Sequence, residues 1–278
     1  MTDPTIGRLR VNGATLHYEV RGKGPLLLLI PGGAGGAAAF DGVADDLAAA
    51  YTVATYDPRG MSRSTLDDPE AEQRVAEHAD DALRLLDLLS PEEPARVFGM
   101  SAGAIAALGL LTARPERVER VVAHEPPLVE VLPDAAEHRA LPERVREVFR
   151  TQGLMPAMAE FAAGLAKGGE AAVPKAAMEL PPQAAARAER TMANLPYFVE
   201  RIVPSFMLYA ADLHRLEALV DRLVLAGGQD SHGELPYRSA ASLAQRLGTE
   251  FLHFPGGHTG LTTHPAEFGT ALRKAFGD

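Results

Sequence analysis

The chain has 278 residues, a net charge of −10 and no cysteine. The acidic balance, with no run of lysine or arginine, makes nucleic acids and anionic membrane surfaces unsuitable partners. The lack of cysteine excludes disulfides, thiolate catalysis and zinc–sulfur sites. With 46% apolar and 23% charged residues, the composition is that of an ordinary globular protein.

Targeting and metal-binding signals are missing from the sequence. No apolar run approaches the ~18 residues of a membrane-spanning helix, and the N-terminus lacks the pattern of a secretory signal, so we expect a cytosolic protein. The nine histidines are scattered, with no H-E-x-x-H spacing, so we expect no metal site. We also expect no cofactor and a small-molecule partner, and the sequence leaves a homodimer open.

The N-terminal part of the chain is typical of strands alternating with helices. Residues 8–11 and 15–20 alternate in polarity around Asn12-Gly13, which predicts a β-hairpin. Residues 26–30 are continuously apolar, as in a strand buried on both faces of a parallel sheet. A helix, a strand at 51–56 and a helix over 72–89 are predicted next.

A G-x-S-x-G motif follows, from Gly99 to Gly103, with Ser101 at its centre. It lies between an apolar strand, residues 96–98, and a helix beginning near residue 104. At such a junction the turn is tight, the serine takes strained backbone angles, and its oxygen projects above the sheet edge. We therefore predict that Ser101 is a nucleophile. The alternative is a plain glycine-rich turn.

The alternation of strands and helices stops after Glu125-Pro126-Pro127 and resumes near residue 222. Between these points the chain reads as successive helices rich in alanine. A helical insertion between two strands of a parallel sheet is expected to cover the carboxyl ends of the strands, where ligands bind. We predict a helical cap at 127–222 over a core of residues 1–126 and 223–278.

Strand and helix patterns alternate again to the C-terminus. Strands are predicted at 222–226 and 250–254, and helices at 237–247 and 265–276. Together with the N-terminal half, this pattern predicts an α/β fold with a mostly parallel, doubly wound sheet.

Four motifs in a fixed order carry a family resemblance: Pro31-Gly32-Gly33, Asp57-Pro58-Arg59-Gly60, the Ser101 motif and Pro255-Gly256-Gly257-His258. In these the chain resembles the α/β-hydrolase superfamily over nearly its whole length. The resemblance implies the α/β-hydrolase fold and hydrolase chemistry. It does not specify a substrate, because this fold hosts many activities.

Two shorter stretches are similar to the zearalenone-lactonase-like enzymes, namely His124-Glu125-Pro126 and residues 60–64. In that group the catalytic acid is a glutamate at the end of the strand that follows the serine motif. The resemblance therefore implies that Glu125 is the acid of a catalytic triad.

Ser101 needs a base, because a free hydroxyl is a poor nucleophile at neutral pH. His258 follows the last predicted strand on a glycine-rich loop, and it comes after the serine in the chain order of this fold. We predict that His258 is the base. The alternative is an exposed loop histidine.

The histidine in turn needs an acid, and two carboxylates compete for this role. Asp230 follows the strand at 222–226, the usual place for the superfamily's acid. Glu125 lies at the end of the preceding strand, where a carboxylate without a partner would be costly to bury. The sequence positions alone do not decide which of the two carboxylates is the acid, and the lactonase-like resemblance favours Glu125.

The oxyanion hole is expected to consist of two backbone N–H groups, those of Gly33 and Ala102. Ala34 is the alternative to Gly33. In the second motif, Arg59 is expected to pair with Asp57 rather than with an acidic substrate.

These predictions describe a serine hydrolase that cleaves a carboxylic ester or lactone of an apolar or aromatic small molecule. No cluster of arginine or lysine in the insertion suggests a phosphorylated substrate. Two alternatives stay open. One is an amidase similar to proline iminopeptidases, because residues 31–35 loosely match the glycine-rich loop of those enzymes. The other is a non-catalytic ligand receptor on the same fold.

Overall fold

The computed structural model describes residues 3–169 and 182–277. The strands within these residues are β1 Thr5–Val11, β2 Ala14–Arg21, β3 Leu26–Ile30, β4 Thr52–Tyr56, β5 Thr65–Leu66, β6 Ala95–Met100, β7 Val118–His124, β8 Leu223–Gly228 and β9 Phe251–Phe254. The helices that flank them are α1 Asp41–Leu47, α2 Val75–Leu89, α3 Ala102–Ala113, α10 Leu235–Leu247, α11 Gly260–Thr263 and α12 Pro265–Phe276.

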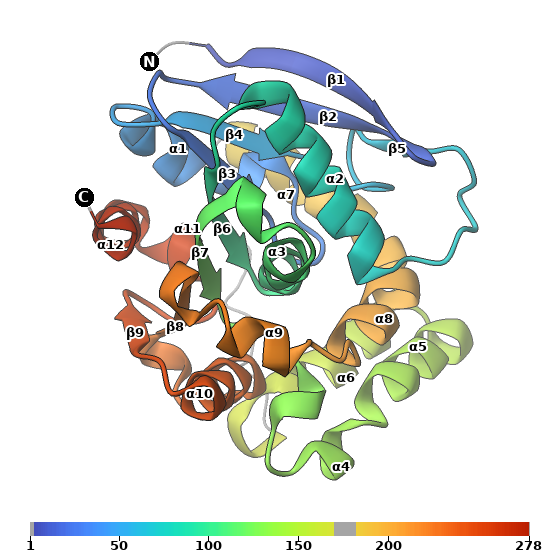
Figure 1. Ribbon diagram of the computed structural model, residues 1–278. Helices are drawn as coiled ribbons and strands as arrows, with labels where there is room; N and C mark the ends of the chain where they lie inside the picture. The colour runs from blue at the N-terminus through green and yellow to red at the C-terminus, as the bar shows by residue number, and fades with distance from the viewer. Residues whose placement is uncertain (1–2, 170–181, 278) are drawn as a thin grey trace.

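The strands form one sheet in the order β1-β2-β4-β3-β6-β7-β8-β9, with β5 paired to β2. β1, β2 and β4 pair antiparallel, and every neighbouring pair from β4 to β9 is parallel. Helices cover both faces of the sheet (Figure 1). The predicted α/β class, with a mostly parallel, doubly wound sheet, is confirmed.

Alternation along the central strands divides the interior into two cores. In β3, Leu27 and Leu29 pack with residues of α1 and α12, whereas Leu26, Leu28 and Ile30 pack with residues of α2 and α3. A strand with this many buried side chains has no solvent face, because helices lie against both sides. The continuous apolar run is thus the signature of a central strand.

Local predictions hold with small shifts in their bounds. The hairpin between β1 and β2 has Val11 opposite Ala14, and Gly13 takes a φ of +75° in its two-residue turn. α2 begins at Val75 rather than at residue 72, because the backbone of Arg74 is extended. Strand β5 was not predicted. None of the helices in the described ranges is long and apolar enough to cross a membrane.

The insertion between β7 and β8 is helical in its described residues, with no strand. Its helices are α4 Ala135–His138, α5 Leu141–Gln152, α6 Leu154–Leu165, α7 Pro182–Tyr197, α8 Val203–Met207 and α9 Leu213–Glu217. α4, α5, α6 and α8 gather at the end of the sheet toward which β6 and β7 point (Figure 1). This is the end where ligands bind in open parallel sheets.

Candidate active site

Ser101 lies at the junction of β6 and α3, in a conformation that only a tight turn imposes. Its φ and ψ are 55° and −121°. A Cβ on Gly99 would lie 2.4 Å from the carbonyl oxygen of Gly103, and a Cβ on Gly103 would lie 2.3 Å from that of Ile30. Both glycines are therefore required for the close approach of β6, α3 and β3 around the serine.

Backbone strain among the described residues concentrates near this serine. Three non-glycine residues there have a positive φ, namely Ser62, Ser101 and Glu125. Each such conformation costs about 1–3 kcal/mol and persists only where the surroundings enforce it. Because strain of this kind gathers at functional sites, the three residues point to this region as one.

Glu125 follows β7 and is held from several sides. Its N–H donates to the carbonyl of Ala226 at 3.0 Å. Its Oε1 accepts hydrogen bonds from the N–H of Gly228 at 2.8 Å and from the hydroxyl of Ser231. Its Oε2 lies 2.5 Å from Nδ1 of His258. The side chain is 0% exposed, so the carboxylate is fixed by its partners and cannot turn toward water.

These contacts decide the ionisation of Glu125. Burial raises the pKa of its carboxyl, but the hydrogen bond and the charge of His258, with the hydroxyl of Ser231, outweigh burial and the net pKa is lowered. A carboxylate that stays ionised against the ring of a histidine fixes its tautomer and stabilises its protonated form.

Asp230, the competing acid, lies elsewhere. It is exposed, next to Ser231, and its backbone N–H donates to the carbonyl of Gly256 at 3.0 Å. Its carboxylate makes no hydrogen bond or ion pair within the described part of the chain. The structure thus brings Glu125, and not Asp230, to His258. The motif Gly-Gly-Gln-Asp-Ser does contribute to the site, but through Ser231, which the sequence analysis missed.

Ser101 and His258 line one cavity of about 320 Å³. No hydrogen bond joins the two side chains within the ranges described, and such contacts often tighten only when a substrate is bound. The His258 side chain is 23% exposed, so the ring is accessible from the cavity while its far nitrogen is held by Glu125.

The loop after β3 runs beside the serine. A Cβ on Gly32 would lie 3.2 Å from the Cβ of Ser101. The N–H groups of Gly33 and Ala102 donate no hydrogen bond to any described residue. The first N–H groups of a helix have no partner within it, so Ala102 at the start of α3 has a donor to spare. The two N–H groups predicted to donate to an oxyanion therefore lie near Ser101.

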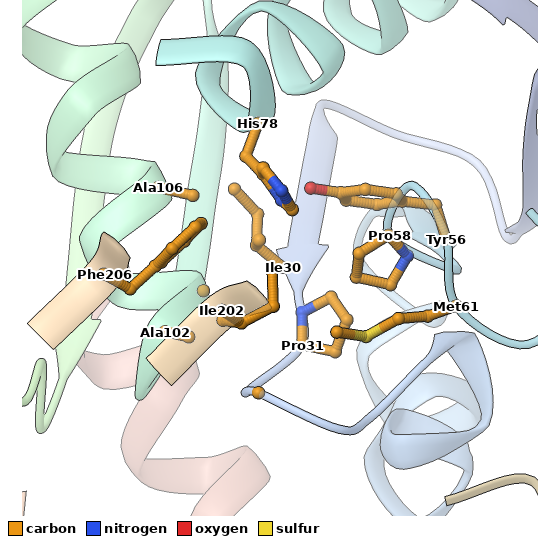
Figure 2. Close-up of a pocket in the computed structure, with 12 residues that line it drawn as sticks. Ile30, Pro31, Tyr56, Pro58, Met61, His78, Ala102, Ala106, Ile202 and Phe206 are labelled. Carbon is orange, nitrogen blue, oxygen red and sulfur yellow. The ribbon is translucent and has the colours of Figure 1, made fainter. Parts of the chain in front are cut away.

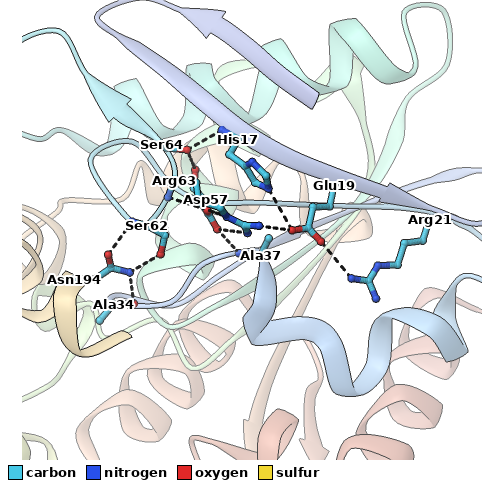
Figure 3. Close-up of polar contacts among 10 residues, drawn as sticks. All are labelled: His17, Glu19, Arg21, Ala34, Ala37, Asp57, Ser62, Arg63, Ser64 and Asn194. Carbon is cyan, nitrogen blue, oxygen red and sulfur yellow. Dashed lines mark hydrogen bonds and ion pairs between the residues drawn. The ribbon is translucent and has the colours of Figure 1, made fainter. Parts of the chain in front are cut away.

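Asn194 of α7 ties the insertion to this loop (Figure 3). Its Nδ2 donates to the carbonyl of Ala34 at 2.9 Å and to the hydroxyl of Ser62 at 3.0 Å. Its Oδ1 accepts from the N–H of Ser62 at 2.8 Å. Asn194 is only 5% exposed, and a buried amide with these partners fixes both loops against α7.

The pairing expected for Arg59 is wrong. Arg59 is buried and donates to Asp81 at 2.7 and 2.6 Å. Asp57 instead accepts from Arg63, at 2.7 Å from its Nε, and from the N–H of Ala37 at 2.8 Å (Figure 3). The prediction failed because the turn after Asp57 directs the Arg59 side chain toward Asp81 of α2. Arg63, four residues further along the chain, contacts Asp57 instead.

A second, much smaller cavity lies beside the loop that follows β3 and carries the predicted oxyanion donor Gly33 (the oxyanion loop). It measures about 20 Å³ and is bordered by both Gly33 and Ala102. Figure 2 shows the rings of His78 and Phe206 on its wall. Burial, and then the charge of Arg59, lower the pKa of His78 to about 3, so this ring is neutral. The space holds one water at most, whereas the cavity lined by Ser101 and His258 has room for a small molecule.

The larger cavity also contains residues that the sequence analysis did not single out. From the insertion these are Phe161, Leu165, Arg187, Arg190, Thr191 and Phe198. The signal available in the sequence was helical spacing, which places 187, 190, 191 and 194 on one face of a helix. Spacing alone could not show that this face turns toward Ser101.

Comparison with known proteins agrees with the fold. A family model described as alpha/beta hydrolase fold matches residues 25–265. The uncharacterized hydrolase YraK of Bacillus subtilis (strain 168) is 37% identical over 273 residues, which cover 96% of this chain and 94% of that protein. A zearalenone hydrolase of Bionectria ochroleuca is 36% identical over 122 residues, 42% of this chain and 45% of that protein.

Among solved structures, a thermophilic esterase from Thermogutta terrifontis superposes with a TM-score of 0.74 at 18% sequence identity, covering 99% of this chain and 98% of that one. At this identity the likeness concerns the fold alone. The family match and the full-length relative go further: the chain belongs to the α/β-hydrolase fold family and is a hydrolase.

Proposed function

We propose that this hydrolase cleaves a carboxylic ester or lactone through an acyl-enzyme on Ser101. The observation that carries the proposal is the contact of 2.5 Å between Nδ1 of His258 and Oε2 of Glu125, a buried carboxylate beside the strained Ser101. A nucleophile, a base and an acid that orients the base are the parts that this chemistry needs.

In the first half-reaction, the Ser101 oxygen attacks the carbonyl carbon while Nε2 of His258 takes the hydroxyl proton. Glu125 stabilises the protonated ring. The carbonyl oxygen, now an oxyanion, accepts hydrogen bonds from the N–H groups of Gly33 and Ala102. When the carbon–oxygen bond to the alcohol breaks, His258 gives its proton to the leaving oxygen.

In the second half-reaction, His258 removes a proton from water, and the resulting hydroxide attacks the ester carbon on Ser101. Collapse of the intermediate releases the carboxylic acid and returns the proton to the serine oxygen. For a lactone the alcohol and the acid are two ends of one product. No step in this sequence calls for a metal or an organic cofactor.

The relatives support the same bond type. A protein named zearalenone hydrolase aligns with part of this chain, and an esterase shares its fold. The rings of Phe161 and Phe198 pack edge to face, with their centroids 5.4 Å apart. They give the cavity an apolar wall suited to an aromatic or aliphatic group. We further propose that residues 127–222 act as a cap over this cavity.

A fluorophosphonate probe tests the proposal without a guess about the substrate. Intact mass spectrometry should find one adduct on the wild-type protein and none on Ser101→Ala. A panel of esters and lactones should then be hydrolysed by the wild type only. An unmodified wild type, with no turnover across the panel, would contradict the proposal and favour a non-catalytic receptor.

A further inference from the structure

The cavity beside Ser101 has two unlike walls. One part is apolar and comes from the insertion: Phe161, Leu165 and Phe198. Another part contains Arg187 and Arg190 of α7. Apart from His258, these are the only basic side chains among the described residues that line the cavity. Its volume of about 320 Å³ is in the range of small-molecule sites.

The position of the two arginines follows from how α7 is anchored. Residues three, four and seven apart share one face of a helix, so 187, 190, 191 and 194 lie on the same side of α7. Asn194 fixes this face against the carbonyl of Ala34, next to the expected oxyanion donor Gly33. Arg190 lies about one turn from this anchor and Arg187 about two turns. Their side chains therefore project over the substrate space.

Neither guanidinium makes an ion pair or hydrogen bond with any residue in the described ranges. Other arginines of the site region differ. Arg59 is paired with Asp81, and Arg63 with Asp57 and Glu19. The whole chain carries a charge of −10, so acidic partners are abundant. Within the part of the chain that the structure describes, these two cations therefore give the cavity a positive surface with no acidic residue bonded to it.

Two acidic residues, Asp57 and Asp41, lie near the cavity arginines. Asp57 also lines the cavity, but it is 1% exposed and its oxygens are occupied by Arg63 and the N–H of Ala37. Asp41 lies near Arg187, which lowers its pKa, although burial, the largest influence, gives a net rise. Asp41 is hydrogen-bonded to Arg21 at 3.3 Å. Neither acid occupies the two cavity arginines.

We propose that Arg187 and Arg190 bind a carboxylate of the substrate, so that the enzyme prefers esters or lactones that carry a free carboxylate beside an apolar body. This inference rests on the proposed ester or lactone hydrolysis. A guanidinium matches a carboxylate with two parallel N–H donors, and such charge-assisted bonds are stronger than neutral ones. The apolar wall receives the rest of the molecule, and Ser101 receives the ester carbonyl.

Two matched pairs of substrates test this preference. The first places the carboxylate on the acyl side: mono-4-nitrophenyl adipate against methyl 4-nitrophenyl adipate. The second places it on the alcohol side: 4-(hexanoyloxy)benzoate against its methyl ester. In at least one pair the charged ester should have a kcat/KM about tenfold higher or more, with the gain mainly in KM. The gain should shrink as ionic strength rises.

The double variant Arg187→Gln/Arg190→Gln should abolish this preference, bringing the ratio within the pair close to one. Arg246→Gln is the control for loss of an arginine as such, because it removes one guanidinium at an exposed position of α10 outside the cavity; its ratio should equal that of the wild type. No preference in either pair, or a preference that survives the double variant, would overturn the inference.

A protection experiment separates this failure from failure of the proposed function. In the wild type, adipate should slow labelling of Ser101 by the fluorophosphonate more than dimethyl adipate does. In the double variant, the two compounds should slow labelling equally. If Ser101 reacts with the probe but adipate gives no extra protection and the charged esters no advantage, only the carboxylate site is wrong. If Ser101 does not react with the probe and no ester is cleaved, the hydrolytic mechanism itself is wrong.

Discussion

The two sides of the cavity are built in opposite ways. On the sheet side, Ser101 and Glu125 hold strained backbone angles, and the Glu125 carboxylate is fully buried with a partner for each oxygen. On the α7 side, Arg187 and Arg190 keep partly exposed side chains without a partner in the described residues. The first arrangement is rigid before any ligand arrives, and the second is left available for one.

This difference suggests that the sheet side carries the reaction and that α7 carries substrate recognition. Pre-oriented groups lower a barrier because they need no rearrangement during the reaction. Unpaired charges on a helix add binding energy only for ligands that match them. The sheet side would thus determine which bond is broken, and α7 would determine which molecule is held. Replacing residues on each side tests that division.

The largest effect is expected on the sheet side, from Glu125→Gln. The amide loses the negative charge that stabilises protonated His258 and favours the wrong ring tautomer, so kcat should fall by about 10³-fold or more. Asp230→Asn should change kcat by less than about threefold, because Asp230 is exposed and not bonded to His258. Steady-state kinetics on one ester decides, with circular dichroism to check folding. The reverse order of effects would make Asp230 the acid.

Gly33→Ala should have the next largest effect. A Cβ at this position would lie 2.1 Å from the ring of Phe198, which is itself buried. Because the buried ring has little room to move, we expect the loop to shift and to carry its N–H away from the predicted oxyanion position. Loss of one such donor lowers kcat by about 10²-fold. The double variant Gly33→Ala/Phe198→Ala should recover most of the loss, because it removes the clash. No recovery would mean that the alanine acts by another route.

The sheet side should also carry the acid sensitivity of the fold. His124 is fully buried between Phe254 and Phe268, and neither ring nitrogen has a hydrogen-bond partner in the described residues. Burial, the largest cause, lowers its pKa to about 4. Between the unfolded pKa near 6.5 and this value, the unfolded chain binds more protons, so stability falls as pH decreases.

Replacing this ring should therefore reduce the loss of stability in acid. From pH 7 to pH 4.5, the free energy of unfolding of His124→Phe should fall by about 2 kcal/mol less than that of the wild type. Urea unfolding at the two pH values measures this. His214→Gln, at an exposed position of α9, is the control and should follow the wild type. Equal losses in wild type and His124→Phe would assign the acid sensitivity to other groups.

Much of the sheet side could be predicted from the sequence, because local chemistry dictates it. Gly99 and Gly103 are forced by close backbone approach, and the apolar run of β3 by burial on both faces. Such requirements leave a readable motif. Even so, the choice between Glu125 and Asp230 needed the side-chain contacts, because both follow neighbouring strands at the same sheet edge.

The α7 side could not be predicted in the same way. Arg187, Arg190 and Asn194 lie more than 80 residues from Ser101 in the chain, and no spacing rule links them to it. Their role depends on how the insertion packs across the strand ends, a tertiary property. Phe161 and Phe198 of this segment line the cavity, which agrees with the expected apolar or aromatic substrate, but the sequence analysis gave no role to its arginines.

Asn194 joins the two sides and should show the smallest effect. Asn194→Ala removes the bonds to Ala34 and Ser62, so the oxyanion loop loosens, and kcat should fall about tenfold. The rate of fluorophosphonate labelling should fall with kcat, a readout that a simple loss of stability would not change below the unfolding temperature. Glu189→Ala, at an exposed position of α7, is the control.

The carboxylate preference of this variant then shows how far the two sides depend on each other. If Asn194 acts only on the oxyanion loop, both members of an ester pair slow equally and their ratio stays that of the wild type. If the amide also sets the position of α7, the ratio falls together with kcat, because Arg187 and Arg190 move with the helix. An Asn194→Ala enzyme with wild-type kcat and labelling rate would show that the loop holds its position without α7.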